Sequence, residues 1–129
     1  MASGALVAGL DAGRSYTDWP LMAGEIFPSN YIDAELGVRS LFEGREATQF
    51  NHRFLAYVLF AACWISVWLA RSGELYRDFR LLALFMSVQA VWGVLTLVNA
   101  APMSLALLHQ AFGVIVFLAA VRLAVRALR

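Results

Sequence analysis

The chain has 129 residues, of which 61% are hydrophobic and 15% are charged, and its formal net charge at pH 7 is +1. This apolar excess, with a strongly positive mean hydropathy, lies beyond the balance of a soluble domain and predicts a membrane protein. The arginines are explained by membrane topology, so the sequence gives no indication of nucleic-acid binding.

Residues 1–13 are apolar apart from Ser3 and Asp11, but they are too few to cross a bilayer. A signal peptide would need a basic amino-terminal region, which this segment lacks. We therefore expect residues 1–13 to be the outer end of a helix whose beginning is missing. The chain is accordingly expected to be a fragment of a longer protein.

Residues 14–47 form a long polar segment that is broken by Pro20 and Pro28. Connections of this length are usually functional, so we expect an outer loop that packs over the mouth of a helical bundle. Its aromatic residues favour a place at headgroup level as interfacial anchors, an interpretation that we prefer to ligand contact. These residues are Trp19, Phe27, Tyr31 and Phe42.

Three runs without charged residues follow, at residues 54–70, 81–101 and 103–121. At about 1.5 Å per residue, each run crosses most or all of the roughly 30 Å hydrocarbon core. We predict transmembrane helices at residues 48–71, 80–100 and 103–127. The expected fold class is all-α, an integral membrane bundle of three complete transmembrane helices plus the end of a fourth.

The chain has no lysine, so arginines alone indicate the orientation. Residues 71–80 and 122–129 carry three arginines each, and the tail has no acid near it in sequence. Short basic segments favour the cytoplasm, whereas residues 11–51 carry seven acidic residues and are expected outside. This pattern predicts a multi-pass protein with a cytoplasmic carboxy terminus.

The two histidines, His52 and His109, lie near the outer ends of two spans that run in the same direction. Two neutral imidazoles at similar depth on parallel helices are what bis-histidine ligation of a haem iron requires. The spans hold no carboxylate for a bridged metal centre, and zinc needs more ligands than two histidines and the distant Cys63. From spacing alone, ligation and an ordinary interfacial role stay equally open.

Small side chains lie one helical turn from His109, at Ala106 and Gly113, where they would let a flat macrocycle or another helix approach. The middle span carries a small and polar stripe that we expect to face protein rather than lipid. The stripe comprises Gln89, Gly93, Thr96 and Ala100. Arg53 either pairs with a haem propionate or anchors its helix end among lipid phosphates.

Four stretches carry a family resemblance: GALVAGLDAGRSYTDWPLMAGEIFP (residues 4–28), TQFNHRFLAY (48–57), QAVWGVLTLV (89–98) and LALLHQAFGVIV (105–116). In order and spacing they resemble the carboxy-terminal half of haem A synthase of the proteobacterial and mitochondrial type. The likeness covers essentially the whole chain. Two positions depart from the family pattern: Asn51, where aspartate is common, and Trp92, where leucine is usual and the change looks like one of packing or of the lipid side.

That family is similar in plan to two four-helix bundles in tandem, each with a histidine pair, and the resemblance implies that this chain is the haem b-binding half. The implied site residues are His52 and His109 as axial ligands, with Arg53, Gln89, Ala106 and Gly113 around the cofactor. The other half of the family holds haem O and carries a glutamate, three residues before its first histidine, that is linked to the chemistry. Gln49 matches that position here, so the resemblance implies no catalytic residue in this chain.

The resemblance implies an oxidoreductase of the bacterial inner membrane that oxidises the methyl group at ring position 8 of haem O to a formyl group, in haem A biosynthesis for cytochrome oxidase. This fragment alone would be inactive without the substrate half. Its implied partners are haem O, haem O synthase, an electron acceptor and membrane lipids, and an oligomer is allowed. The alternatives are a free-standing bis-histidine membrane cytochrome b that carries electrons and a non-haem assembly protein.

Overall fold

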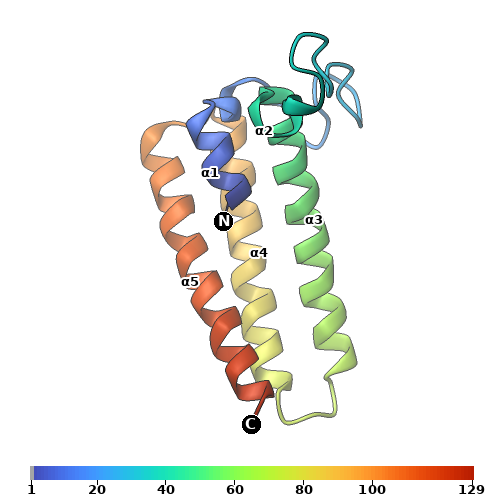
Figure 1. Ribbon diagram of the computed structural model, residues 1–129. Helices are drawn as coiled ribbons and strands as arrows, with labels where there is room; N and C mark the ends of the chain where they lie inside the picture. The colour runs from blue at the N-terminus through green and yellow to red at the C-terminus, as the bar shows by residue number, and fades with distance from the viewer. Residues whose placement is uncertain (1) are drawn as a thin grey trace.

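The protein is an elongated bundle of helices in the computed structural model, which describes residues 2–129 (Figure 1). Three long helices run side by side and alternate in direction: α3 (Arg45–Leu69), α4 (Tyr76–Val98) and α5 (Met103–Ala127). The short helix α1 (Ala2–Gly9) lies beside one end of the bundle and runs in the direction of α4. The all-α fold class predicted from the sequence is thus confirmed, and α3 and α5 are parallel.

All three long helices have the length and apolar character needed to cross a membrane. Many of their large hydrophobic side chains are exposed, as in Trp68, Val91 and Phe117, and this is the surface that lipid covers in a multi-pass membrane protein. The helices α3 and α4 begin earlier than the predicted residues 48 and 80. Helical hydrogen bonding continues through polar residues at the helix ends, which hydrophobic runs alone do not mark.

The end of the bundle at which α3 and α5 begin is called here the histidine end. The short helix η1 (Ala12–Arg14) and a long loop, residues 15–44, lie at this end, and the loop contains η2 (Gly37–Arg39) and α2 (Ser40–Glu43). In Figure 1 the loop lies on the α3 side of this end and does not extend to α5. We expected from the sequence that this loop would pack over the mouth of the bundle. It covers only part of that mouth.

Two loop aromatics pack on α3. The Tyr31 hydroxyl donates a hydrogen bond of 2.8 Å to Asn51 Oδ1, and the rings of Phe27 and Phe50 have centroids 4.9 Å apart. Trp19, Phe27 and Phe42 are exposed, at 49%, 55% and 64%, whereas Tyr31 is partly buried. Of the four expected interfacial anchors, Phe27 and Tyr31 thus join the loop to the bundle. Asn51 is the residue of α3 that accepts the Tyr31 hydrogen bond.

The opposite end, at which α4 begins and α5 ends, carries an ion pair that the sequence did not indicate. Arg126 Nη1 donates to both carboxylate oxygens of Asp78, at 2.7 and 2.6 Å. The tail has no acid near it in sequence, but the fold places the Asp78 carboxylate beside it. The two residues are far apart in sequence, and only the antiparallel packing of α4 and α5 brings them together.

Candidate functional site

The two histidines meet inside the histidine end of the bundle. Their ring centroids are 6.5 Å apart and their planes are nearly perpendicular, at 87°. Each ring lies about two turns from the start of its helix, so the parallel helices α3 and α5 bring them to the same depth. Both side chains are partly buried. The structure therefore places His52 and His109 together between two helices, rather than separately at the surface.

The His52 ring is contacted by α1. Ser3 Oγ lies 3.1 Å from His52 Nδ1, within hydrogen-bond distance. At Gly4, a Cβ atom would lie 3.5 Å from His52 Cε1, which is ordinary van der Waals contact. No sequence pattern indicates a role for this hydroxyl, because Ser3 lies in a short apolar segment far from His52 along the chain. Only the docking of α1 on the bundle brings the two side chains together.

The His109 ring is contacted by α4. A Cβ atom at Gly93 would lie 2.9 Å from His109 Cε1, closer than real Cβ contacts allow. Gln89 Nε2 donates to the His109 carbonyl oxygen at 3.0 Å and lies 3.2 Å from Nδ1 and 3.4 Å from Nε2 of the ring. Because these last two distances are nearly equal, the amide lies against the ring and not in line with one nitrogen.

The polar stripe of α4 faces protein along most of its length. Gln89 and Gly93 contact His109, and the hydroxyl of the buried Thr96 lies 3.4 Å from the Leu105 carbonyl oxygen of α5. The expectation is wrong for Ala100, which is exposed and lies beyond the end of α4 with φ at 58°. Thus three of the four stripe positions build the α4–α5 contact.

The two small residues on either side of His109 differ in their surroundings. Gly113 lies close to Gln89, since a Cβ there would be 3.2 Å from Gln89 Nε2. Ala106 lies one turn nearer the start of α5 and is partly buried. Gly113 therefore leaves room for the Gln89 side chain, which contacts His109. The expected contact of Ala106 and Gly113 with a cofactor stays a prediction.

Arg53 joins α3 to the long loop. Its guanidinium donates three hydrogen bonds to loop carbonyl oxygens: Nη1 to Asp18 at 3.0 Å, Nη1 to Leu21 at 3.0 Å and Nη2 to Tyr16 at 2.9 Å. The residue is only 8% exposed. This burial contradicts an anchor among lipid phosphates, and a contact with a haem propionate stays a prediction. The charge-assisted bonds instead hold the loop against the helix that carries His52.

Gln49 supports the same connection. It is 2% exposed, and its Nε2 donates to the Tyr16 carbonyl oxygen at 2.8 Å. Tyr16 O therefore accepts from both Gln49 and Arg53. Within the loop, backbone N–H groups around Ala23 hold the pKa of the Asp18 carboxyl below its usual value. Gln49 thus has a structural contact at the position where the resemblance places the catalytic acid of the family's other half.

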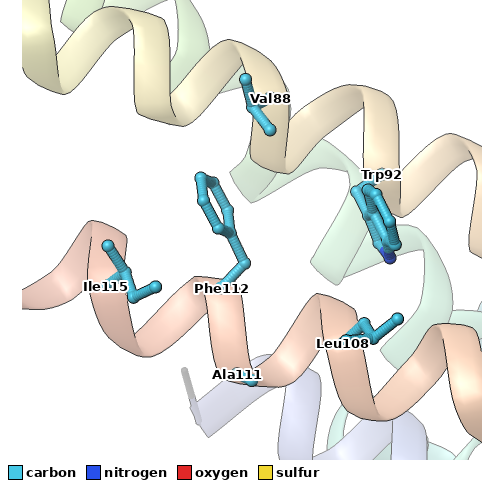
Figure 2. A pocket seen from close by; sticks show the side chains of 6 residues that line it. All are labelled: Val88, Trp92, Leu108, Ala111, Phe112 and Ile115. Carbon is cyan, nitrogen blue, oxygen red and sulfur yellow. The ribbon is translucent and has the colours of Figure 1, made fainter.

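Two cavities lie outside the histidine pair. One, of about 610 Å³, lies between the loop and α3 and is lined by Arg53 and aromatic side chains including Trp19, Phe50 and Tyr57. The other, of about 320 Å³, is an apolar groove between α4 and α5 (Figure 2). The indole of Trp92 lines this groove and donates to the Leu105 carbonyl oxygen at 3.3 Å. In Figure 2, α1 and α3 lie behind the groove, so it opens away from them.

Metal-ligand clusters of three or more His, Cys, Asp or Glu side chains do not occur within residues 2–129. Cys63 is a free cysteine on α3, far down the helix from His52. The donor set that the fold assembles is therefore a pair of imidazoles, flanked by a serine hydroxyl on one side and a glutamine amide on the other.

Comparison with known proteins gives this site a context. The family model described as cytochrome oxidase assembly protein matches residues 1–121. A protein named heme A synthase from Hyphomonas neptunium (strain ATCC 15444) is 68% identical over 94% of this chain and 34% of its own length. One from Ruegeria sp. (strain TM1040) is 46% identical over 92% of this chain and 32% of its own length.

A third relative, the heme A synthase of Caulobacter vibrioides (strain ATCC 19089 / CIP 103742 / CB 15), is 46% identical over 84% of this chain and 33% of its own length. The chain thus spans about a third of the length of these curated relatives. No solved structure matches it. Since the family match covers most of the chain, the protein belongs to the cytochrome oxidase assembly protein family, with heme A synthases among its relatives, as the sequence resemblance indicated.

Proposed function

We propose that this chain is the haem b-binding part of a haem A synthase, with His52 and His109 as the two axial ligands. The observation that carries the proposal is the 6.5 Å separation of the two imidazole centroids between parallel helices. The names of the relatives support the assignment to a haem A synthase. The geometry of the histidine pair supports haem as the cofactor.

The spacing of the rings fits one iron between them. Axial imidazoles on one metal have centroids about 6 Å apart, because a metal–nitrogen bond of about 2 Å adds to about 1 Å from nitrogen to ring centre on each side. The measured separation is 6.5 Å. The glycine at position 93 leaves room for the His109 ring, where a Cβ atom would clash at 2.9 Å, and a Cβ at Gly4 would make only ordinary contact with the His52 ring. The pair thus has both the donor chemistry and the clearance that axial ligands need.

A haem held by two imidazoles has no open coordination position, so when bound it would relay single electrons rather than activate oxygen. The residues of this chain would serve that role by fixing geometry. His52 and His109 present neutral nitrogens, Gln89 and Gly93 hold the His109 ring against α4, and the apolar helices exclude water. Such fixed ligands favour electron transfer because little has to rearrange between redox states.

The whole reaction belongs to a protein longer than this chain. We propose that it oxidises the ring-position-8 methyl group of haem O to a formyl group, for cytochrome oxidase. Haem O would bind in the part that the relatives have beyond this match, so this chain alone would be inactive. Haem O synthase would supply the substrate, and a separate acceptor would take the electrons. Gln49, with its amide held by the loop, supports a role for this part outside the acid–base chemistry.

An absorption spectrum of the full-length protein extracted from membranes tests this proposal. We expect narrow bands of a low-spin b-type haem that sharpen on reduction, because both axial positions are filled by imidazole. A protein that purifies colourless would contradict the proposal and favour a non-haem assembly role. A free-standing cytochrome b would give the same spectrum, and it would be favoured if the natural reading frame encodes no second histidine-bearing bundle.

We also propose that the histidine end faces the outside of a bacterial inner membrane and that the carboxy terminus is cytoplasmic. The arginine clusters of residues 71–80 and 122–129 lie together at the opposite end of the bundle, and this supports a cytoplasmic location for that end. A phosphatase reporter inserted at the exposed Ser29 should be active, and one fused after Arg129 should be inactive. The reverse pattern would refute this orientation.

A further inference from the structure

From the contact between α1 and α3, we infer that Ser3 is a positioning residue for His52: its hydroxyl accepts a hydrogen bond from Nδ1–H and leaves Nε2 as the nitrogen that faces the cofactor. The inference rests on the proposed haem ligation. It goes further by assigning a role to a residue that is neither a ligand nor a neighbour of His52 in sequence.

The geometry of the contact is specific. Ser3 Oγ lies 3.1 Å from His52 Nδ1, and α1 approaches so closely at Gly4 that a Cβ there would touch His52 Cε1 at 3.5 Å. Two successive residues of α1 thus bound the same edge of the imidazole, the edge formed by Nδ1 and Cε1. The remaining nitrogen, Nε2, is left free of this contact.

The chemistry of imidazole then determines the tautomer. A neutral ring carries one N–H and one lone pair, and the nitrogen that binds a metal must be the one with the lone pair. If Nε2 binds iron, Nδ1 carries the proton and needs an acceptor, which a serine hydroxyl provides. Metal-bound histidines are commonly held in this way, and the acceptor also raises the basicity of the ligand.

The second histidine has a different kind of neighbour. The amide nitrogen of Gln89 donates one of its two N–H groups to the His109 carbonyl oxygen, and it is nearly equidistant from both ring nitrogens. It holds the ring in place but does not select a tautomer. Of these two contacts, only that of the Ser3 hydroxyl is directed at a single ring nitrogen, so the two histidines are not equivalent.

The test compares Ser3 variants of the full-length haem protein. Ser3→Ala removes the acceptor, so we expect haem to be retained but to transfer about 10- to 100-fold faster to an apoprotein acceptor, since removal of such a partner typically weakens metal binding by that factor. The midpoint potential should rise, because a less basic imidazole stabilises the oxidised iron less. Ser66→Ala is the matched control, since its hydroxyl donates to the Ala62 carbonyl oxygen of its own helix.

A second pair of variants separates the hydroxyl from packing. Ser3→Thr keeps an oxygen and should keep the wild-type potential, whereas Ser3→Val has the same shape without the oxygen and should behave as Ser3→Ala does. Equal potentials and equal haem transfer rates for the Thr and Val variants would overturn the inference. A different result would refute the ligation itself: an unchanged haem content after replacement of His52. The failure of the Ser3 inference and the failure of the proposed ligation are therefore distinguishable.

Discussion

Replacement of either His52 or His109 by alanine is expected to remove the low-spin spectrum of one haem from the full-length protein. Each imidazole supplies one of two axial bonds, and the rings lie 6.5 Å apart with the iron proposed between them. With one ligand gone, the remaining imidazole cannot hold a six-coordinate low-spin iron. Haem content by pyridine haemochrome and the low-temperature electron paramagnetic resonance spectrum measure the loss directly.

The control for this experiment is a neighbour of His109 on α5. Gln110 is exposed, so Gln110→Ala should leave both the haem content and the spectrum unchanged. Glycine variants of the two histidines extend the test, because added imidazole can occupy the space and should restore the low-spin signal if the fold is intact. An unchanged spectrum in both histidine variants would show that the pair does not ligate the haem.

The sequence could predict the spans because their signal is local. A charge-free run of membrane length and a basic flanking segment depend on neighbouring residues alone, so α3, α4 and α5 are each recognisable without tertiary information. The shared depth of His52 and His109 also follows, since parallel helices of similar register place equivalent positions at one level. Their separation in the plane of the membrane, however, depends on how the helices pack.

The contacts that the sequence missed all join segments far apart in the chain. Ser3 meets His52, Arg53 meets the carbonyl oxygens of the loop, and Arg126 meets Asp78. None of these pairs has a helical spacing or a sequence motif that signals it. Arg53 is instructive, because a basic residue at a predicted membrane boundary is usually read as a lipid anchor. Its burial depends on the fold of a loop whose backbone carbonyls no sequence pattern reveals.

Introduction of a side chain at Gly93 is expected to have the second large effect. A Cβ there would lie 2.9 Å from His109 Cε1, so the His109 ring would have to move away from α4. Gln89 also contacts His109, so its side chain would have to move as well. Glycine-to-alanine replacement inside a helix normally stabilises by about 1 kcal/mol. Here overpacking, which typically costs about 1–3 kcal/mol, should reverse the sign and displace one axial ligand.

The effect should grow with side-chain size. Gly93→Ala is expected to lower the fraction of low-spin haem and to lower thermal stability, and Gly93→Leu to abolish binding of that haem, because no shift of a few tenths of an ångström accommodates a branched side chain. Gly9→Ala is the matched control, since a Cβ at Gly9 meets nothing within 4 Å, and it should be neutral. A Gly93→Leu protein with a wild-type spectrum would mean that the His109 ring does not rest on α4 in the haem-bound protein, and the clearance that Gly93 provides would then have no part in ligation.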